Sequence, residues 1–194
     1  MTEAGSRATG ALRIGVTGHR VLAERERVAA GVDATLARIE GRFPGRPLVV
    51  VSALAEGADR LVAEAVLRRP GARLCAVLPL PAPDYLADFA SPESRDEFLR
   101  LLAQADEVVE LPARVSRAEA YAAANDQMLD GIDVLVAVWD GKVAQGEAGT
   151  AEVVARARAR RLPIAWVHAG NRKPGTMEAM AQGADQGSVT YENL

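Results

Sequence analysis

The loop Gly-Val-Thr-Gly-His-Arg, near the start of the chain, concentrates residue types that can hold an anion. Gly15 and Gly18 let the backbone turn tightly and approach a ligand closely. Thr17 supplies a hydroxyl, and Arg20, beside His19, can grip a phosphate with two hydrogen bonds. The alternative is a plain glycine turn with two solvated polar residues, but its place directly after an apolar run favours a ligand loop. It lacks the G-x-G-x-x-G pattern and predicts no standard nicotinamide site.

A second candidate loop is Ser-Ala-Leu-Ala-Glu-Gly-Ala-Asp. A helix is expected to begin at Gly57, whose missing side chain leaves room for a phosphate at the free N–H groups and positive dipole of the first turn. Ser52, Glu56 and Ala58 are counted with Gly57 as candidate ligand contacts. Asp59 has two interpretations, since it can complement the helix start or contact the ligand.

A third glycine-rich loop follows another apolar run. Its candidate ligand contacts are Trp139, Asp140, Gly141, Gly146, Gly149 and Thr150. Gly149 and Thr150 open the last long predicted helix, so bare amides, a hydroxyl and the helix dipole point to one place, as in a phosphate cradle. The alternative is a glycine hinge with a threonine cap. Two similar loops elsewhere in the chain favour the cradle.

A polar cluster interrupts the helix predicted at 116–129. It contains Tyr121, Asn125, Asp126 and Gln127. Such residues lower helix propensity, and Tyr121 and Asn125, four residues apart, share one face. A functional and a purely structural role both remain open, and Asn125 is kept as a candidate ligand contact.

The elements that must position these residues are six short apolar runs that alternate with amphipathic segments. The runs are rich in Val, Ile, Leu and Ala, as in strands buried on both faces of a parallel sheet. The predicted strands are Leu12–Thr17, Leu48–Ala53, Arg73–Pro79, Glu107–Leu111, Val134–Trp139 and Pro163–His168. The predicted helices cover about Ala23–Glu40, Gly57–Arg69, Pro92–Ala105, Ser116–Leu129 and Thr150–Arg161.

This alternation predicts the α/β class, as a Rossmann-like open parallel sheet with helices on both faces. In such a sheet, ligands bind outside the carboxyl ends of the strands, near the point where the strand order reverses. The three glycine loops all follow strands, so we expect them to meet there. Three prolines between positions 79 and 83 predict a rigid loop. Tyr85, which follows it, either packs in the core or stacks on a base.

The length of 194 residues predicts one domain. We expect a flexible tail over 1–11, the Rossmann-like domain over 12–169 and an arm over 170–194, with a short strand near Ser188–Tyr191 as one alternative for the arm.

The net charge of −3 argues against a nucleic-acid partner. Apolar runs such as Leu74–Leu80 are too short to span a bilayer, so no membrane partner is expected. A lone cysteine, Cys75, is expected to be a buried core thiol and fits a cytoplasmic location. The spacing of His19 and His168 predicts no metal site, and no cofactor is expected. The abundance of Ala and Arg is typical of a bacterial genome rich in GC.

Taken together, the candidate loops and the polar cluster resemble the SLOG superfamily. The segments that carry the resemblance are Gly-Val-Thr-Gly-His-Arg, Ser-Ala-Leu-Ala-Glu-Gly-Ala-Asp-Arg, Ala-Asn-Asp-Gln-Met and Trp-Asp-Gly with Gly-Thr-Ala-Glu. This superfamily joins Rossmann-like domains similar to LOG phosphoribohydrolases and the DNA-processing protein. The resemblance covers about Leu12 to His168, and the last loop is also similar to that of nucleoside 2-deoxyribosyltransferases. It implies binding of a nucleotide or nucleotide sugar at these loops, within a homodimer or homotetramer.

The resemblance implies two kinds of function, since some members cleave an N-glycosidic bond and others are thought to sense nucleotide signals. We expect a nucleotide-binding sensor or regulator. The alternative is an N-glycosidic bond hydrolase or transferase acting on a nucleoside monophosphate, with Glu152, Glu147 and Asp126 as candidate catalytic carboxylates and Asp140 as a further one. LOG enzymes place their glutamate three residues after the threonine, where this chain has Val153. Glu152 comes one residue early, which turns it by about 100° on a helix. A third possibility is an interaction subunit with a vestigial pocket.

Overall fold

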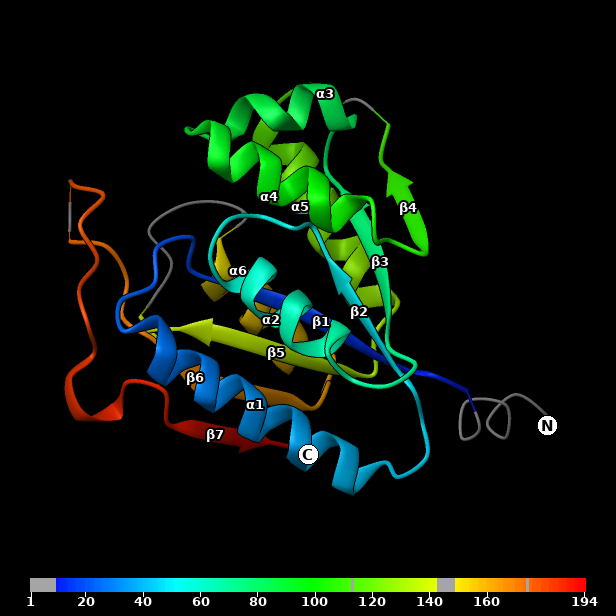
Figure 1. Ribbon diagram of the computed structural model, residues 1–194, viewed down its shortest axis with the longest axis vertical. Coiled ribbons are helices and arrows are strands. Elements are labelled where there is room, and N and C mark those ends of the chain that lie inside the picture. The colour runs from blue at the N-terminus through cyan, green and yellow to red at the C-terminus, as the bar shows by residue number, and fades with distance from the viewer. Residues whose placement is uncertain (1–9, 113, 143–148, 174) are drawn as a thin grey trace.

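The computed structural model describes residues 10–112, 114–142, 149–173 and 175–194 (Figure 1). Its strands form one seven-stranded sheet in the order β4-β3-β2-β1-β5-β6-β7. All neighbouring pairs are parallel except β6 and β7, which are antiparallel. The strands are β1 (Leu12–Gly18), β2 (Leu48–Ser52), β3 (Arg73–Leu78), β4 (Glu107–Glu110), β5 (Val134–Trp139), β6 (Ile164–His168) and β7 (Val189–Glu192). The predicted Rossmann-like α/β fold is confirmed.

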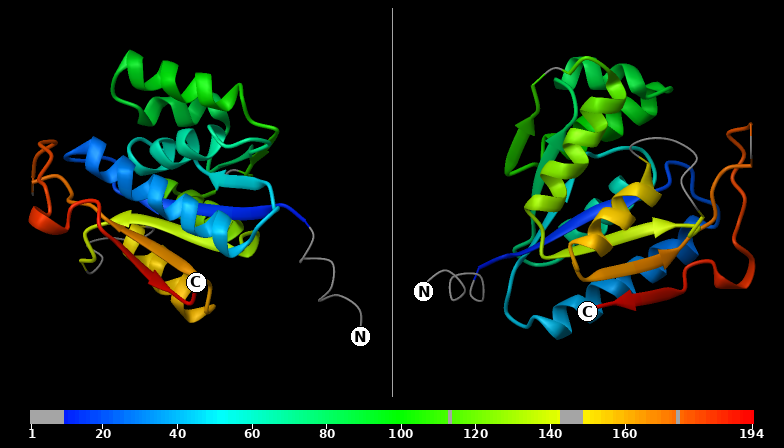
Figure 2. Two further views of the ribbon diagram at one scale, coloured as in Figure 1. Left: turned by 60° about the horizontal axis from the view of Figure 1, so that its bottom comes forward. Right: turned by 180° about the vertical axis from the view of Figure 1, so that it is seen from behind.

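Helices cover both faces of the sheet (Figure 2). The helices are α1 (Arg25–Arg42), α2 (Ala58–Leu67), α3 (Ala82–Tyr85), α4 (Pro92–Leu102), α5 (Arg117–Asp130) and α6 (Thr150–Ala159), with short 3₁₀ turns η1 (Leu86–Asp88) and η2 (Gly183–Asp185). Helices α1 and α2 pack on one face, and α5 and α6 on the other. Every residue of β2 and β5 is buried because both of their faces are covered. Cys75 is a buried free thiol, as predicted.

The six predicted strands agree with β1 to β6 to within a residue at each end. The starts of two helices follow from their caps, since Ser91 Oγ accepts from the Ser94 N–H at 3.2 Å and Ser116 Oγ accepts from the Glu119 N–H at 3.2 Å. The proline-rich segment after β3 is not only a loop as predicted. Pro81 precedes the single helical turn α3, and Pro83 lies within that turn, where proline fits because no N–H is needed.

The C-terminal segment continues past β6 and returns to the sheet. It runs beside the carboxyl ends of β1 and β5 (orange to red in Figure 1) before β7 adds an edge strand. The buried Gln186 fixes its base, since Gln186 Oε1 accepts from the Gly170 and Gln182 N–H groups, both at 2.9 Å. Its amide donates to the Ala23 carbonyl at 2.7 Å, which ties this segment to the chain after β1.

The strand order reverses at β1, which lies between β2 and β5. From β1 the chain builds outward to β4 on one side and then returns to add β5 and β6 on the other. Helices on opposite faces therefore diverge beyond the carboxyl ends of β1 and β5, which leaves a crevice there. In the part of the chain that the structure describes, no helix has the length and apolar character needed to cross a membrane.

Candidate functional site

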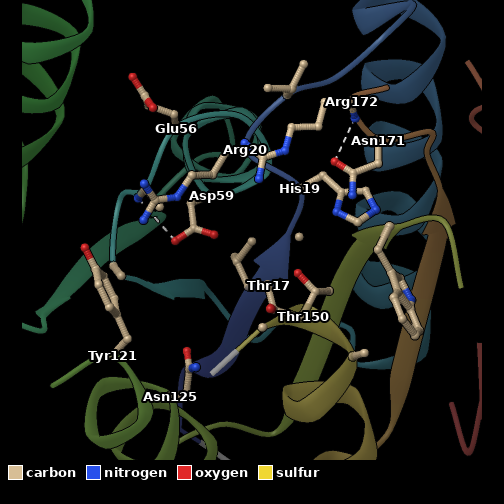
Figure 3. A pocket seen from close by; sticks show the side chains of 18 of the residues that line it. Thr17, His19, Arg20, Glu56, Asp59, Tyr121, Asn125, Thr150, Asn171 and Arg172 are labelled. Atoms are coloured by element: carbon tan, nitrogen blue, oxygen red, sulfur yellow. Dashed lines mark hydrogen bonds between the residues drawn. The ribbon is translucent and has the colours of Figure 1, made fainter. Parts of the chain in front are cut away.

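A cavity of about 710 Å³ opens at the carboxyl ends of β1 and β5. This volume lies within the range of about 300–1,000 Å³ that is usual for small-molecule sites. The structure brings all three predicted loops and the polar face of α5 to it. The predicted residues that line it are Thr17, Gly18, His19, Arg20, Glu56, Asp59, Asn125, Trp139, Asp140, Gly149 and Thr150. Figure 3 shows the side chains of Thr17, Asp59 and Thr150 directed toward a common space.

The N-terminus of α6 forms one wall of the cavity. Gly149 precedes the helix in an extended conformation, and Gly149, Thr150 and Ala151 all line the cavity. Within the described residues, no side chain caps this helix, while the N–H groups of Glu152 and Val153 already bond to the Gly149 carbonyl. The positive end of the helix dipole therefore faces the cavity, which favours an anionic group there.

Arg20 lies on the opposite side, beside the aromatic wall that α5 contributes. Its guanidinium carbon is 5.8 Å from the centre of the Tyr121 ring. The Tyr121 hydroxyl donates to Asp88, and Arg117 Nη1 lies 2.6 Å from the other oxygen of that carboxylate. Arg20 is thus an exposed cation at the cavity rim, held beside an aromatic ring.

His19 joins the β1 loop to the β5 loop. The backbone N–H of Asp140 donates to His19 Nε2 at 3.0 Å, so Nε2 carries no proton and the neutral ring has its proton on Nδ1. Burial lowers the pKa of His19, although the Asp140 carboxylate, 3.2 Å from Nε2, acts in the opposite direction. His19 is therefore neutral at pH 7 and positions the two loops.

Asp59 lies in the first turn of α2 and also at the cavity wall, so the structure is compatible with both of its interpretations. Its carboxylate is buried, and Oδ2 accepts from Ser52 Oγ at 3.0 Å and from the Ala55 N–H at 3.4 Å. Burial raises the pKa of Asp59 to about 6, while the bond from Ser52 lowers it. Asp59 also lines the cavity. Ser52 does not line it, because its buried hydroxyl holds Asp59 and accepts from the Leu54 N–H at 3.0 Å.

The expected phosphate cradle at the start of α2 is wrong. The Ala58 N–H donates to the His19 carbonyl at 3.0 Å, so the β1 loop already uses this helix end. Gly57 has a φ of +78°, and a Cβ there would lie 2.4 Å from the carbonyl oxygens of both His19 and Arg20. Gly57 and Ala58 do not line the cavity and instead let two loops pack together.

Two other predicted contact residues also have packing roles. A Cβ at Gly15 would lie 2.4 Å from Met128 Sδ, so this glycine lets α5 approach β1. A Cβ at Gly141 would lie 2.6 Å from the Trp166 ring, which covers that position. Neither glycine lines the cavity.

Two of the candidate catalytic carboxylates are not brought to the cavity, whereas Asp140 lines it. Asp126 and Glu152 are absent from its lining, and Arg156 pairs with them at 2.6 Å and 2.5 Å respectively. This cluster links α5 to α6. The neighbouring residues Asn125 and Ala151 do line the cavity. Asp126 and Glu152 each follow one of them by one position, and on a helix this difference directs their side chains away from the cavity. Glu147 and Gly146 lie outside the described residues.

The sequence did not identify the contribution of the C-terminal segment. Asn171 and Arg172 line the cavity (Figure 3). Met177 and Met180 line it as well. No local pattern marks them, because they meet the site only through the fold. Tyr85 packs in the core, as one of its two interpretations held, with ring centres 5.0 Å from Phe89 and 5.6 Å from Phe98. It also lines the cavity.

Among the described residues, no group of three or more His, Cys, Asp or Glu side chains could hold a metal ion. No protein-family model matches the chain, and no curated protein matches it. A search of solved structures finds similarity to the structural-genomics target TM1055. The identity is 18%, the alignment covers 79% of this chain and 72% of that chain, and the TM-score is 0.47.

Proposed function

We propose that this chain binds a nucleotide or nucleotide sugar in the cavity and acts as a sensor or regulator. The observation that carries the proposal is the N-terminus of α6, which no described side chain caps. It faces a cavity of nucleotide size at the point where the strand order reverses. The resemblance of these loops to the SLOG superfamily supports the same ligand class.

The charges along the cavity suggest how such a ligand lies. A phosphate fits against Gly149 and Thr150, where backbone amides and the helix dipole favour negative charge. Arg20, Lys142 and Arg172 supply positive charge around the same cavity. The remainder of the ligand then extends toward Asp59 and the aromatic wall.

A regulator is preferred to a hydrolase because Asp126 and Glu152 face Arg156 rather than the cavity. One observation supports the hydrolase as a second candidate. The Asp140 carboxylate lines the cavity near the end of β5, and a carboxylate can stabilise an oxocarbenium-like centre.

Isothermal titration with AMP, ADP, ADP-ribose and NAD tests the proposal. We expect at least one of them to bind with a saturable isotherm, and Arg20→Ala to weaken it by about tenfold or more, since a hydrogen bond to a charged group contributes about 1.5–3 kcal/mol. Arg73→Ala is the matched control, because Arg73 is exposed at the start of β3, at the other end of the sheet.

No binding by any of the four compounds would refute the proposal. Equal losses in Arg20→Ala and Arg73→Ala would refute the assigned site. Release of free base on incubation, abolished in Asp140→Asn, would favour the hydrolase.

A further inference from the structure

The Tyr85 hydroxyl is a buried polar group that no described residue satisfies. Tyr85 is 0% exposed, and its hydroxyl has no hydrogen-bond partner within the described residues. Buried hydroxyls are nearly always paired, because an unpaired one loses its bonds to water and gains none in return. Tyr85 lines the cavity, so a bound ligand can supply the missing partner.

The Asp59 carboxylate lines the same cavity, and its charge acts on the Tyr85 hydroxyl. Burial raises the pKa of the Tyr85 hydroxyl well above its usual range, and the negative charge of Asp59 raises it further. The phenol therefore stays protonated and acts as a donor. Ser52 and Ala55 both donate to Oδ2 of Asp59, which fixes the carboxylate at the cavity wall.

A donor and an anionic acceptor that meet one ligand group select the chemistry of that group. A phosphate would be repelled by Asp59, and an ammonium group could not accept from Tyr85. A hydroxyl both accepts and donates, so it satisfies the two residues together.

A nucleobase edge also offers both functions, but proteins commonly stack the base on an aromatic face. Near Tyr85, the faces of the aromatic rings already contact other side chains. The Tyr121 ring carries the Arg20 guanidinium, and the Tyr85 ring is enclosed by Phe89, Phe98 and Tyr121. The ligand part that meets Tyr85 and Asp59 is therefore a sugar.

We propose that Tyr85 and Asp59 form a subsite for a ribose hydroxyl, in which the phenol donates to the hydroxyl oxygen and the hydroxyl donates to Asp59. This inference rests on the proposed function and makes the site selective for ribonucleotides over deoxyribonucleotides.

The test compares the affinities of AMP, 2′-deoxy-AMP and 3′-deoxy-AMP by isothermal titration. The variants are Tyr85→Phe and Asp59→Asn, with Tyr191→Phe as the matched control on β7. For the unchanged protein we expect one of the two deoxynucleotides to bind about tenfold or more weakly than AMP. Tyr85→Phe and Asp59→Asn should each weaken AMP binding and reduce that preference, whereas Tyr191→Phe should alter neither.

The stability of ligand-free Tyr85→Phe separates recognition from folding. Because none of the described residues bonds to the hydroxyl, its removal should leave the melting temperature unchanged or raise it. Equal binding of AMP and both deoxynucleotides, or a full preference retained in Tyr85→Phe, would overturn the subsite while leaving nucleotide binding in place. Absence of binding by all nucleotides would overturn the subsite together with the proposed function.

Discussion

The buried carboxyl of Asp59 predicts a specific dependence of stability on pH. Its pKa is 3.8 when unperturbed and about 6 in the folded protein, with burial as the main cause. Between these values the folded state holds the proton more tightly than the unfolded state does. The free energy of unfolding that Asp59 contributes is therefore complete below pH 3.8 and decreases as the pH rises to about 6. The difference of about two pKa units corresponds to about 3 kcal/mol.

Asp59→Asn isolates this contribution, because asparagine resembles the protonated acid in shape and charge and its amide oxygen can accept from Ser52 and Ala55. We expect the variant and the unchanged protein to have similar stabilities near pH 4. Near pH 7 the variant should be more stable by about 3 kcal/mol. Taking the difference between the two proteins cancels the titration of other groups, such as His19, whose lowered pKa acts in the opposite direction.

Urea unfolding followed by circular dichroism at pH 4, 5, 6 and 7 measures this difference. A gap that is constant with pH would refute the reasoning, since it would place the pKa of Asp59 at its ordinary value. A variant that is progressively less stable than the unchanged protein as the pH rises would also refute it, because it would mean that the folded protein favours the charged form.

Three further predictions concern packing, catalysis and the phosphate subsite. Gly57→Ala should destabilise the protein by about 3 kcal/mol, because a Cβ there meets two carbonyl oxygens. The control Gly71→Ala has a similar φ of +69° but open space around the Cβ, so it should cost only about 1 kcal/mol. Urea unfolding measures both differences. Similar costs for both would contradict the loop packing. Glu152→Gln should change the Kd for AMP by no more than about twofold, since Glu152 pairs with Arg156 outside the cavity. A tenfold loss of affinity would show that Glu152 contributes to the binding site. Thr150→Val should weaken AMP binding by about tenfold, whereas Thr190→Val on β7 should leave the Kd unchanged in isothermal titration. Equal changes of the Kd in the two variants would argue against a phosphate at the start of α6.

The sequence predicts the fold well because its strands carry a strong local signal. Runs such as Val134–Trp139 are apolar throughout, and this pattern appears where both faces of a sheet are covered. The cap residues Ser91 and Ser116 likewise act within their own helix turns. The sequence does not predict the turn α3, because a proline suits both a rigid loop and the first turn of a helix.

The site is less predictable because its composition depends on contacts between distant segments. The rule that ligands bind at the carboxyl ends of strands correctly placed Thr17, Asp140 and Thr150 at the cavity. It could not show that the β1 loop fills the start of α2, since this depends on the Ala58–His19 bond. Nor could it find Arg172, which reaches the cavity from a segment more than 150 residues after the first loop.

Nuclear magnetic resonance of the backbone amides during titration with AMP tests most directly whether nucleotides bind at the start of α6. The amides of Gly149, Thr150 and Ala151 should shift, together with those of Thr17 and Gly18 across the cavity, and the shifts should saturate with a common Kd. Saturable shifts confined to residues outside the cavity lining, or no shifts up to millimolar AMP, would contradict nucleotide binding at this site.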